Sequence, residues 1–436
     1  MKMSPQQFMA NAVERSLSKL FPSYYGSAKH NHYADYGYPE VLTFANFHHM
    51  YKRNGLAKAG VKQTILKTWQ DNPAVWEKKD DDKNDETPLE GEIRQRFDDL
   101  RLWQRTAEVD KRALVGGYSG FIMRLADDKV FKEPVDRVGG GLDGLVEIIP
   151  AWAGQLEVSI WDTDERSETY GEPKMFAFNE AAVGSDANKT RSFEVHPDRV
   201  IIWSEDGTVH PDSALEAGYN DLLDLEKISG AGGEGFWKNA KRGLTFEIDK
   251  ETQMNAMAEA MGVEPSDIAD KIGEAADEFN KGFDSSMLLQ GMKVGTVGVS
   301  MPSPEHFHAV SLMGFAASIP IPVKILVGSQ TGERASTEDA NAWAQTNMSR
   351  RNSTVIPTLR TFVERLERFG ILPERDWHIQ WSDLTENSMG EKADLANKMA
   401  DTNSKSPDEP VYSIGEIRTV TGHDGDNPDV IEEGDE

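Results

Sequence analysis

Two glycine-bearing segments have the spacing of phosphate-binding loops, but neither has the surroundings that this chemistry needs. Gly230, Gly232 and Gly235 satisfy G-x-G-x-x-G, which brings a pyrophosphate to a helix N-terminus when a strand precedes it. Here a helical pattern precedes the glycines, so we interpret them as a flexible junction between domains. The segment 328–336, GSQTGERAS, lacks the Gly-Lys-Ser/Thr that holds phosphate and metal. The sequence therefore predicts no nucleotide site.

Candidate nucleophiles and metal ligands are also weakly supported. Ser119 lies in Gly-Tyr-Ser-Gly, one residue short of the serine-hydrolase turn, and it precedes a strand rather than a helix. A turn is the simpler interpretation, although a hydrolase that uses Ser119 or the histidines remains an alternative. The chain has no cysteine and no HExxH, and the acidic run 80–82 lacks EF-hand spacing. Histidines pair only locally, at His30 and His32, His48 and His49, and His306 and His308. We predict no enzymatic activity, no metal and no cofactor.

Basic residues are sparse and grouped in a chain whose formal net charge is −27. Lys238, Lys241 and Arg242 follow the glycine run, Arg334 lies in the 328–336 segment, and Arg350 and Arg351 lie further on. Such a net charge argues against tight, independent DNA binding, which normally depends on Lys and Arg displacing counterions. Two interpretations stay open: surface charge or pairing between subunits, and transient contacts with DNA phosphates.

The element that must position these groups runs from 303 to 369. A short apolar helix at 303–318 leads to a loop from Val327 to Ala335. A capping box of Ser336 and Asp339 predicts the start of a long helix, about 50 Å in length, which Gly370 ends. Pro357 lies inside that helix, where a proline removes a hydrogen bond, so we expect a kink there.

The rest of the chain alternates helices with short strands and indicates an α+β fold. Helices are expected at 5–21, 41–52, 56–69, 92–114, 214–229, within 251–283, at 386–403 and after a Ser413–Glu416 capping box. Strands are expected at 121–125, 145–150, 156–161, 174–178, 193–195, 199–203, 244–248, 287–299 and 377–381. We interpret 77–92 as a solvated charged loop and 423–436 as a disordered acidic tail. No secretory signal or membrane span is predicted.

Several motifs, in their order and spacing, point to a known family. They are NGLAKAGV at 54–61, ALVGGYSGFIMRL at 113–125, YGEPKMFAF at 170–178, EVHPDRVIIW at 194–203 and FAASIPIPVKILVGSQTGERASTEDANAWAQ at 315–345. The chain resembles the portal proteins of tailed double-stranded DNA phages from about Phe47 to Arg418. The 77–92 loop and the tail match nothing that we can assign.

This resemblance implies the phage portal fold, assembled as a ring of about twelve subunits. It assigns 1–212 to a wing, 213–232 and 301–320 to two stem helices, 233–300 to a clip, and 321–336 to a tunnel loop. The segment 337–384 becomes the long kinked helix and a wing strand, 385–422 a crown-like region, and 423–436 the tail. The tunnel loop then brings to the DNA channel Val327, Gly328, Ser329, Gln330, Thr331, Gly332, Glu333 and Arg334, while Lys238, Lys241 and Arg242 form a basic cluster in the clip.

The resemblance also implies partners and a location. These partners are further copies of the chain, transiently bound double-stranded DNA, the terminase large subunit, the major capsid or scaffold protein and a head–tail adaptor. The ring would lie at one capsid vertex of the virion, after assembly in the host cytoplasm. The acidic charge fits a conduit, because a wall that repels phosphate lets DNA slide. The alternative is an acidic scaffold or adaptor protein that binds only other proteins.

Overall fold

The chain was analysed as a computed structural model, which describes residues 32–77, 86–183, 191–240, 243–248, 255, 258–259, 262–281, 292–297, 303–328, 333–385, 389–405 and 410–422. The predicted helix 5–21, the centre of the charged loop 77–92 and the tail 423–436 lie outside these residues. The chain forms two compact units: unit 1 (Met1–Gly60 and Asp212–Val327) and unit 2 (Val61–Pro211 and Gly328–Glu436). Both units contain helices and strands, as the predicted α+β class requires.

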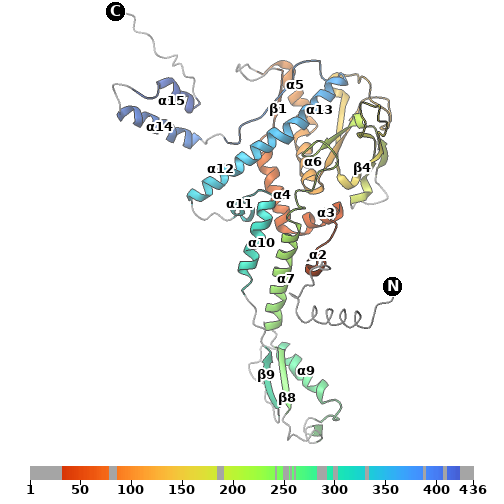
Figure 1. The fold of residues 1–436 in the computed structure, drawn as a ribbon, viewed down its shortest axis with the longest axis vertical. Coiled ribbons are helices and arrows are strands. Elements are labelled where there is room, and N and C mark those ends of the chain that lie inside the picture. The colour runs from red at the N-terminus through yellow and green to blue at the C-terminus, as the bar shows by residue number, and fades with distance from the viewer. Residues whose placement is uncertain are drawn as a thin grey trace, which may run out of the picture. The chain divides into compact units, whose positions relative to one another are not determined.

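Unit 2 contains a three-stranded antiparallel sheet with β2 (Ser119–Leu125) between β3 (Leu145–Trp152) and β7 (Val200–Trp203) (Figure 1). A second antiparallel sheet contains β4 (Leu156–Trp161), β5 (Pro173–Asn179) and β6 (Ser192–Val195). A separate strand pair joins β1 (Ala74–Trp76) to β10 (His378–Gln380). Single 3-10 turns are η1 (Gly141–Gly144), η2 (Ala153–Gln155), η3 (Glu180–Val183) and η4 (Pro197–Arg199). The strands predicted between 121 and 203, and the one at 377–381, are confirmed.

Alternate residues of β2 enter two different cores, because successive side chains of a strand point to opposite faces. Phe121 and Met123 belong to the larger core of unit 2, where the rings of Phe121 and Phe362 lie 5.4 Å apart. Ile122 belongs to the smaller core, beside Phe178. Burial on both faces explains why this strand is a continuous apolar run rather than an alternating one.

The helix predicted at 92–114 is in fact two helices, α5 (Pro88–Asp99) and α6 (Leu102–Gly116). The first begins earlier than predicted, because Thr87 and Glu90 form a capping box. The break falls at Arg101, whose φ of 50° is left-handed. This turn lets both Phe97 and Leu102 enter the larger core, which one straight helix with this spacing would not allow.

The long helix of unit 2 consists of α12 (Glu333–Arg350), a π-helical turn η5 (Arg351–Val355) and α13 (Ile356–Arg368). The π turn lies just before Pro357, and the proline falls in the first turn of α13, where its missing N–H costs little. The kink expected at Pro357 stays a prediction. Gly370 ends the helix as predicted: its φ is 74°, and the Ile371 amide donates to the Leu366 carbonyl at 2.9 Å.

Unit 1 contains α2 (His32–Tyr36), α3 (Phe44–Arg53), α7 (Tyr219–Ala240), α9 (Ile268–Lys281), α10 (Glu305–Ser318), α11 (Val323–Val327) and an antiparallel pair of β8 (Gly243–Ile248) with β9 (Met292–Val297). The helix α4 (Gly55–Thr68) begins in unit 1 after a break at Asn54, as predicted. In unit 2, α14 (Met389–Lys405) and α15 (Ile414–Val420) pack together, and the predicted Ser413–Glu416 capping box is present.

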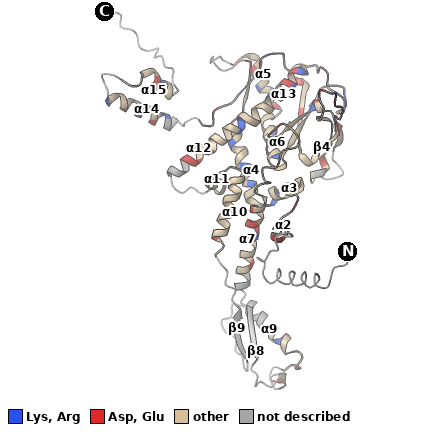
Figure 2. Cartoon of the chain, in the orientation of Figure 1, with Lys and Arg blue, Asp and Glu red and all other residues tan. Residues whose placement is uncertain are grey.

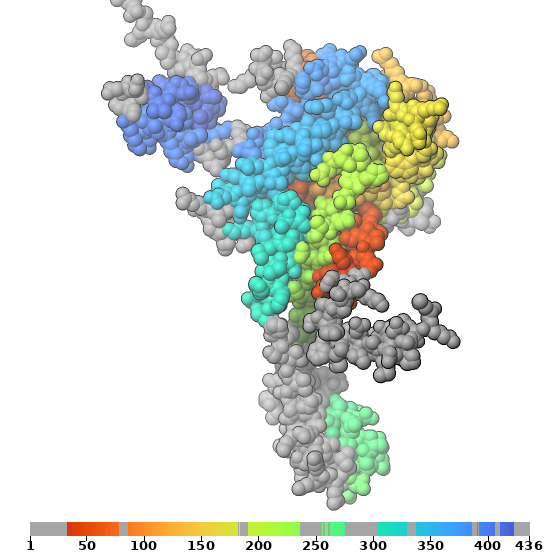
Figure 3. All heavy atoms as spheres, viewed as in Figure 1, coloured from red at the N-terminus to blue at the C-terminus, as the bar shows by residue number. Residues whose placement is uncertain are grey.

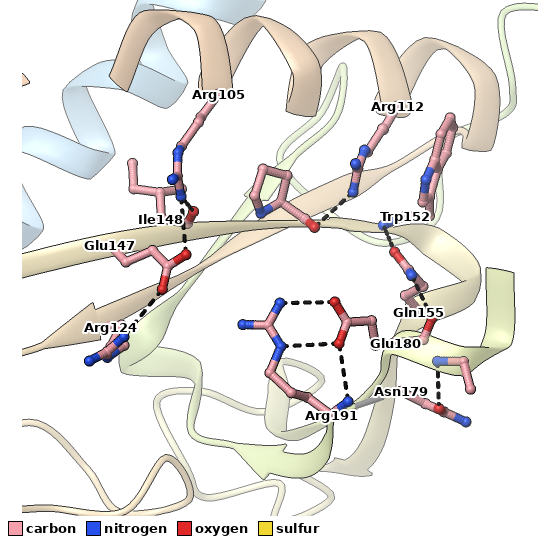
Figure 4. A network of polar contacts seen from close by, with 12 residues as sticks. Arg105, Arg112, Arg124, Glu147, Ile148, Trp152, Gln155, Asn179, Glu180 and Arg191 are labelled. Atoms are coloured by element: carbon pink, nitrogen blue, oxygen red, sulfur yellow. Dashed lines mark hydrogen bonds and ion pairs between the residues drawn. The ribbon is translucent and has the colours of Figure 1, made fainter. Parts of the chain in front are cut away.

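A network of Arg and Glu side chains ties α6 to β3 and β5 to β6 (Figure 4). Arg112 donates to the Pro150 carbonyl at 2.7 Å, and Gln155 donates to the Glu180 carbonyl at 3.0 Å. The Glu180 carboxylate accepts from Arg191 Nε at 3.1 Å and Nη2 at 2.9 Å. The hydrogen bonds that Arg191 donates from its side chain, and then the one from its backbone amide, lower the pKa of Glu180 to about 2.

The Glu180–Arg191 pair predicts a pH-dependent contribution to stability. Because the pKa of Glu180 is lower in the folded chain than its ordinary value, its stabilisation is complete above about pH 5 and disappears as the pH falls to about 2. The stability difference between the parent and Glu180→Gln, measured by urea unfolding, should therefore shrink over that interval. Asp128→Asn on an exposed turn serves as the control. A difference that stays constant between pH 5 and pH 2 would contradict the assignment.

Candidate functional site

Helices α7 and α10 of unit 1 pack side by side, and glycines make the contact close (Figure 1). A Cβ atom at Gly218, just before α7, would lie 2.3 Å from Ser318 Oγ and 2.8 Å from Phe315 Cδ2. Phe315 is fully buried, and Leu222 of α7 is fully buried as well. The Gly- and Ser-bearing sequence at 311–320 thus serves close helix packing within unit 1.

Gly314 of α10 makes the second close approach. A Cβ atom there would lie 2.6 to 2.8 Å from the carboxylate atoms of Asp221 on α7. Burial raises the pKa of Asp221, and the charge of Asp224 adds to the effect. A half-buried carboxylate against a glycine leaves no room for a larger residue at 314.

Part of the surface of α10 is apolar and open to solvent. Phe307, Val310 and Met313 are 60%, 52% and 54% exposed, and they recur every three residues along the helix. Figure 3 shows the atoms of α10 at the surface of unit 1. Contiguous exposed apolar residues at helical spacing are typical of a surface that another protein covers.

The loop predicted from Val327 to Ala335 is shorter in the structure. Val327 is the last residue of α11, and Gly328 follows it with a φ of 72°. Ser329, Gln330, Thr331 and Gly332 lie outside the described residues. Glu333, Arg334 and Ala335 already belong to α12, so the predicted helix start at Ser336 is wrong. Glu, Arg and Ala are strong helix formers, and they extend the helix upstream of the Ser336 signal.

Contrary to our expectation, the glycine run after 229 does not end the helix. The helix α7 continues through Gly230, Gly232 and Gly235 to Ala240, because glycine lowers helix stability but keeps the N–H that proline lacks. Lys238 therefore lies on α7 rather than in a loop. Lys241 and Arg242 lie outside the described residues, just before β8. The basic cluster in the clip stays a prediction.

Arg350 is not an exposed cation on the long helix, because it pairs with Asp110 of α6. The side chain of Asp110 is completely buried, and Arg350 Nη1 donates to its Oδ2 at 2.9 Å while Nη2 donates to Oδ1. Two indole N–H groups complete the shell: Trp69 donates to Oδ2 at 2.8 Å and Trp203 to Oδ1 at 2.9 Å. The carboxylate thus accepts four hydrogen bonds in the core of unit 2.

Arg351, in the π turn, is also buried. Its Nε donates to the Thr68 carbonyl at 2.7 Å, its Nη1 to the Ser382 carbonyl at 2.8 Å and its Nη2 to Asp71 Oδ1 at 2.6 Å. The guanidinium also lies 4.0 Å from the ring centroid of Trp381. The possible DNA role of Arg350 and Arg351 is therefore wrong, because both charges are satisfied inside unit 2.

Ser119 and His48, two of the residues considered for hydrolysis, have structural contacts in the described parts of the chain. Ser119 is fully buried, and its Oγ donates to the Val109 carbonyl at 2.6 Å. His48 stacks on Phe44, with ring centroids 5.6 Å apart. Within the described ranges, no group of three histidines or carboxylates could hold a metal ion. The same residues include no helix that is both long and apolar enough to span a membrane.

Asp110 is the important residue that the sequence analysis missed. Its signal was available: a carboxylate stands between Val109 and Ala113, both buried, in a helix with apolar periodicity. Buried carboxylates are almost always paired, so this position predicts a cation elsewhere in the chain. The sequence alone does not say that the cation is Arg350.

A family model described as phage portal protein matches residues 45–405. The chain belongs to the phage portal protein family. Among solved structures, the neck of a native gene transfer agent particle computed with C12 symmetry is similar in fold, with a TM-score of 0.51 and 14% identity. That match covers 88% of this chain and 95% of the other. The virion of a native gene transfer agent particle matches at 13% identity and a TM-score of 0.47, over 88% and 94% of the two chains. No curated protein matches this chain.

Family membership confirms the resemblance inferred from the ordered motifs. This portal protein is a component of the phage particle, at a capsid vertex. The alternative of a scaffold or adaptor protein is thereby set aside. The α+β class is also confirmed.

Proposed function

We propose that this portal protein assembles as a ring of about twelve subunits, through which DNA is packaged and later ejected. The observation that carries this proposal is the family match over residues 45–405. The symmetry of the gene transfer agent neck, which shares the fold, supports a cyclic assembly with this number of subunits. The net charge of −27 supports a conduit that contacts DNA only transiently, because most of its surface repels phosphate.

Within that ring, α7 and α10 are the stem helices and the paired strands β8 and β9 belong to the clip. The segment between α11 and α12 is the tunnel loop, which the early start of α12 shortens, and α14 and α15 form the crown-like region. The remaining described elements of unit 2 belong to the wing. The terminase large subunit, the capsid or scaffold protein and a head–tail adaptor are the protein partners in this proposal. No catalytic role is assigned to the chain.

The exposed apolar face of α10 is covered by a second copy of the chain. Val310 and Met313 lie at its centre, and they are more than half exposed in the single chain. A ring needs a head-to-tail contact in which one face of each subunit meets a different face of the next. An apolar helix face supplies the desolvated centre of such a contact.

Negatively stained images and light-scattering mass test this proposal together. The parent should form closed rings of about twelve subunits. Val310→Asp with Met313→Asp should leave a folded monomer, because two carboxylates would have to be desolvated in the contact. The matched control is Val130→Asp with Leu395→Asp, which changes two exposed apolar residues of unit 2 and should form rings. Rings in the Val310 and Met313 variant would refute the assigned contact, and a compact dimer of the parent with no higher form would refute the ring.

A further inference from the structure

We propose that the junction of α3 and α4 contacts the phosphates of double-stranded DNA through Lys52, Arg53 and Lys58. This inference rests on the proposed function, since it names a surface by which the portal would touch its cargo. It differs from the predicted tunnel loop and clip cluster, and it replaces the role that Arg350 and Arg351 lose by burial.

The charge distribution along the sequence is the first observation. The chain has 74 acidic residues among 436, yet none lies between Glu40 and Asp71. The same stretch contains five cations, which are Lys52, Arg53, Lys58, Lys62 and Lys67. In Figure 2 the described parts of α3 and α4 accordingly carry blue and no red. A basic stretch in so acidic a protein is the electrostatic footprint of a polyanion contact.

The exposure of the side chains is the second observation. Lys52, Arg53 and Lys58 are all exposed, and among the described residues none of them forms an ion pair. Burial lowers the pKa of His48, and the positive charge of Lys52 on the same helix lowers it further. In the described part of the chain the three cations therefore stay unpaired, while the carboxylate of Glu226 on α7, at the same junction, accepts from Asn54.

The junction holds these cations on a fixed support. Asn54 Nδ2 donates to Glu226 Oε1 on α7 at 3.0 Å. Asn54 Oδ1 accepts from the backbone amides of Leu56 at 2.9 Å and Ala57 at 3.1 Å, which caps α4. Met50 and Ala57 are buried on either side of the break. The cations therefore project from two helices whose meeting point is fastened to unit 1.

Helix stability explains only part of this pattern. Lys52 and Arg53 lie in the last turn of α3, where cations favour the negative end of the helix dipole. Lys58 lies in the first turn of α4, where a cation faces the positive end and is unfavourable. Neither effect accounts for the absence of every acidic residue over both helices.

The surroundings favour DNA over a protein partner. Between residues 42 and 65, no large apolar side chain among the described residues is exposed, and the exposed Val41 and Leu66 lie only at the two ends of this stretch. Protein interfaces are centred on buried apolar and aromatic residues and are depleted of Lys, whereas phosphate contacts need only cations on flexible stems. This surface has the cations and lacks the apolar centre.

The test compares Lys52→Gln/Arg53→Gln/Lys58→Gln with the parent, using the full chain and a short DNA duplex of random sequence. At about 50 mM salt the triple variant should bind at least about tenfold more weakly, and its salt slope should fall by up to about 3, since each lost phosphate contact removes about 0.9. Lys52→Arg with Lys58→Arg should bind as the parent does. The matched control, Lys132→Gln/Arg360→Gln/Lys398→Gln, removes three exposed cations of unit 2 and should change the affinity by less than about threefold.

Three results would overturn the proposal. The first is a triple variant with parental affinity and salt slope, and the second is a parent with no measurable duplex binding at low salt. The third is loss of rings in the triple variant with unchanged DNA affinity, which would assign this surface to a contact between copies. Images of the same preparations separate the proposed portal function from the proposed DNA surface. If the triple variant forms rings and binds DNA as the parent does, the portal function stands and only the DNA surface is refuted.

Discussion

Replacing Asp110 with alanine should lower the free energy of unfolding of this portal protein by about 3–5 kcal/mol. The substitution leaves the partly buried guanidinium of Arg350 without its counterion, and it removes the acceptor of both indole N–H groups. An unpaired buried charge and orphaned donors are among the costliest single changes in a protein. Urea unfolding at pH 7, followed by tryptophan fluorescence, measures the lost free energy of unfolding. Trp69 and Trp203, which donate to Asp110, are among the tryptophans that report the transition.

Two further variants make the Asp110 prediction specific. Asp110→Asn should be nearly as damaging, because its amide nitrogen would face donors rather than acceptors. Glu108→Ala, on the same helix, removes only the surface ion pairs with Lys111 and Arg112 and should cost less than about 1 kcal/mol. If Asp110→Ala cost no more than Glu108→Ala, the network would not hold α12 to α6 as described.

Inserting one alanine after Asn352 in the π turn should destabilise unit 2 by about 4 kcal/mol or more, because several core side chains would leave their sites together. Each residue of an α-helix turns by about 100°, and the turn Arg351–Val355 already accommodates one residue more than an α-helix would. The wider turn absorbs that residue, so the buried face of α12, with Trp343 and Asn347, stays on the same side as Leu359 and Phe362 of α13. A further residue adds about 100° of rotation, so one of the two faces must rotate away from the core.

The matched substitution separates the effect of length from that of the side chain. Asn352 is exposed, so Asn352→Ala should change the free energy of unfolding by no more than about 0.5 kcal/mol. Hydrogen exchange of the amides between 343 and 366 should rise in the insertion variant alone. An insertion variant with the parental urea midpoint would show that the core does not depend on this register.

The sequence anticipated the elements whose signals are local. The strand 156–161 has the predicted bounds, and the helix end at Gly370 and the cap at Ser413 are confirmed. These signals depend on neighbouring residues: a glycine that takes a positive φ, a hydroxyl that accepts an amide three positions on, or an apolar run bounded by turns. The ordered family motifs depend only on the order of residues, and they identified the family correctly.

Local signals were wrong where two of them competed or where the core decided. Ser336 suggested a helix start, but the helix formers before it extend α12 to Glu333. The glycines after 229 suggested a break, yet α7 continues through them. The segment 92–114 was continuous in its periodicity, but the larger core requires Phe97 and Leu102 together, and Arg101 turns the chain.

By itself the sequence determined the α+β class, the order of the elements and the membership of the portal family. Only the tertiary structure decided what the cations do. Arg350 and Arg351 appear in the sequence as two charges on a long helix, and their partners Asp110, Thr68 and Asp71 lie more than two hundred residues earlier. The energy of a charge depends on whether it is solvated or paired, and that depends on which distant segments the fold brings together. The same structure leaves Lys52, Arg53 and Lys58 in solvent, where they are free to meet an anion.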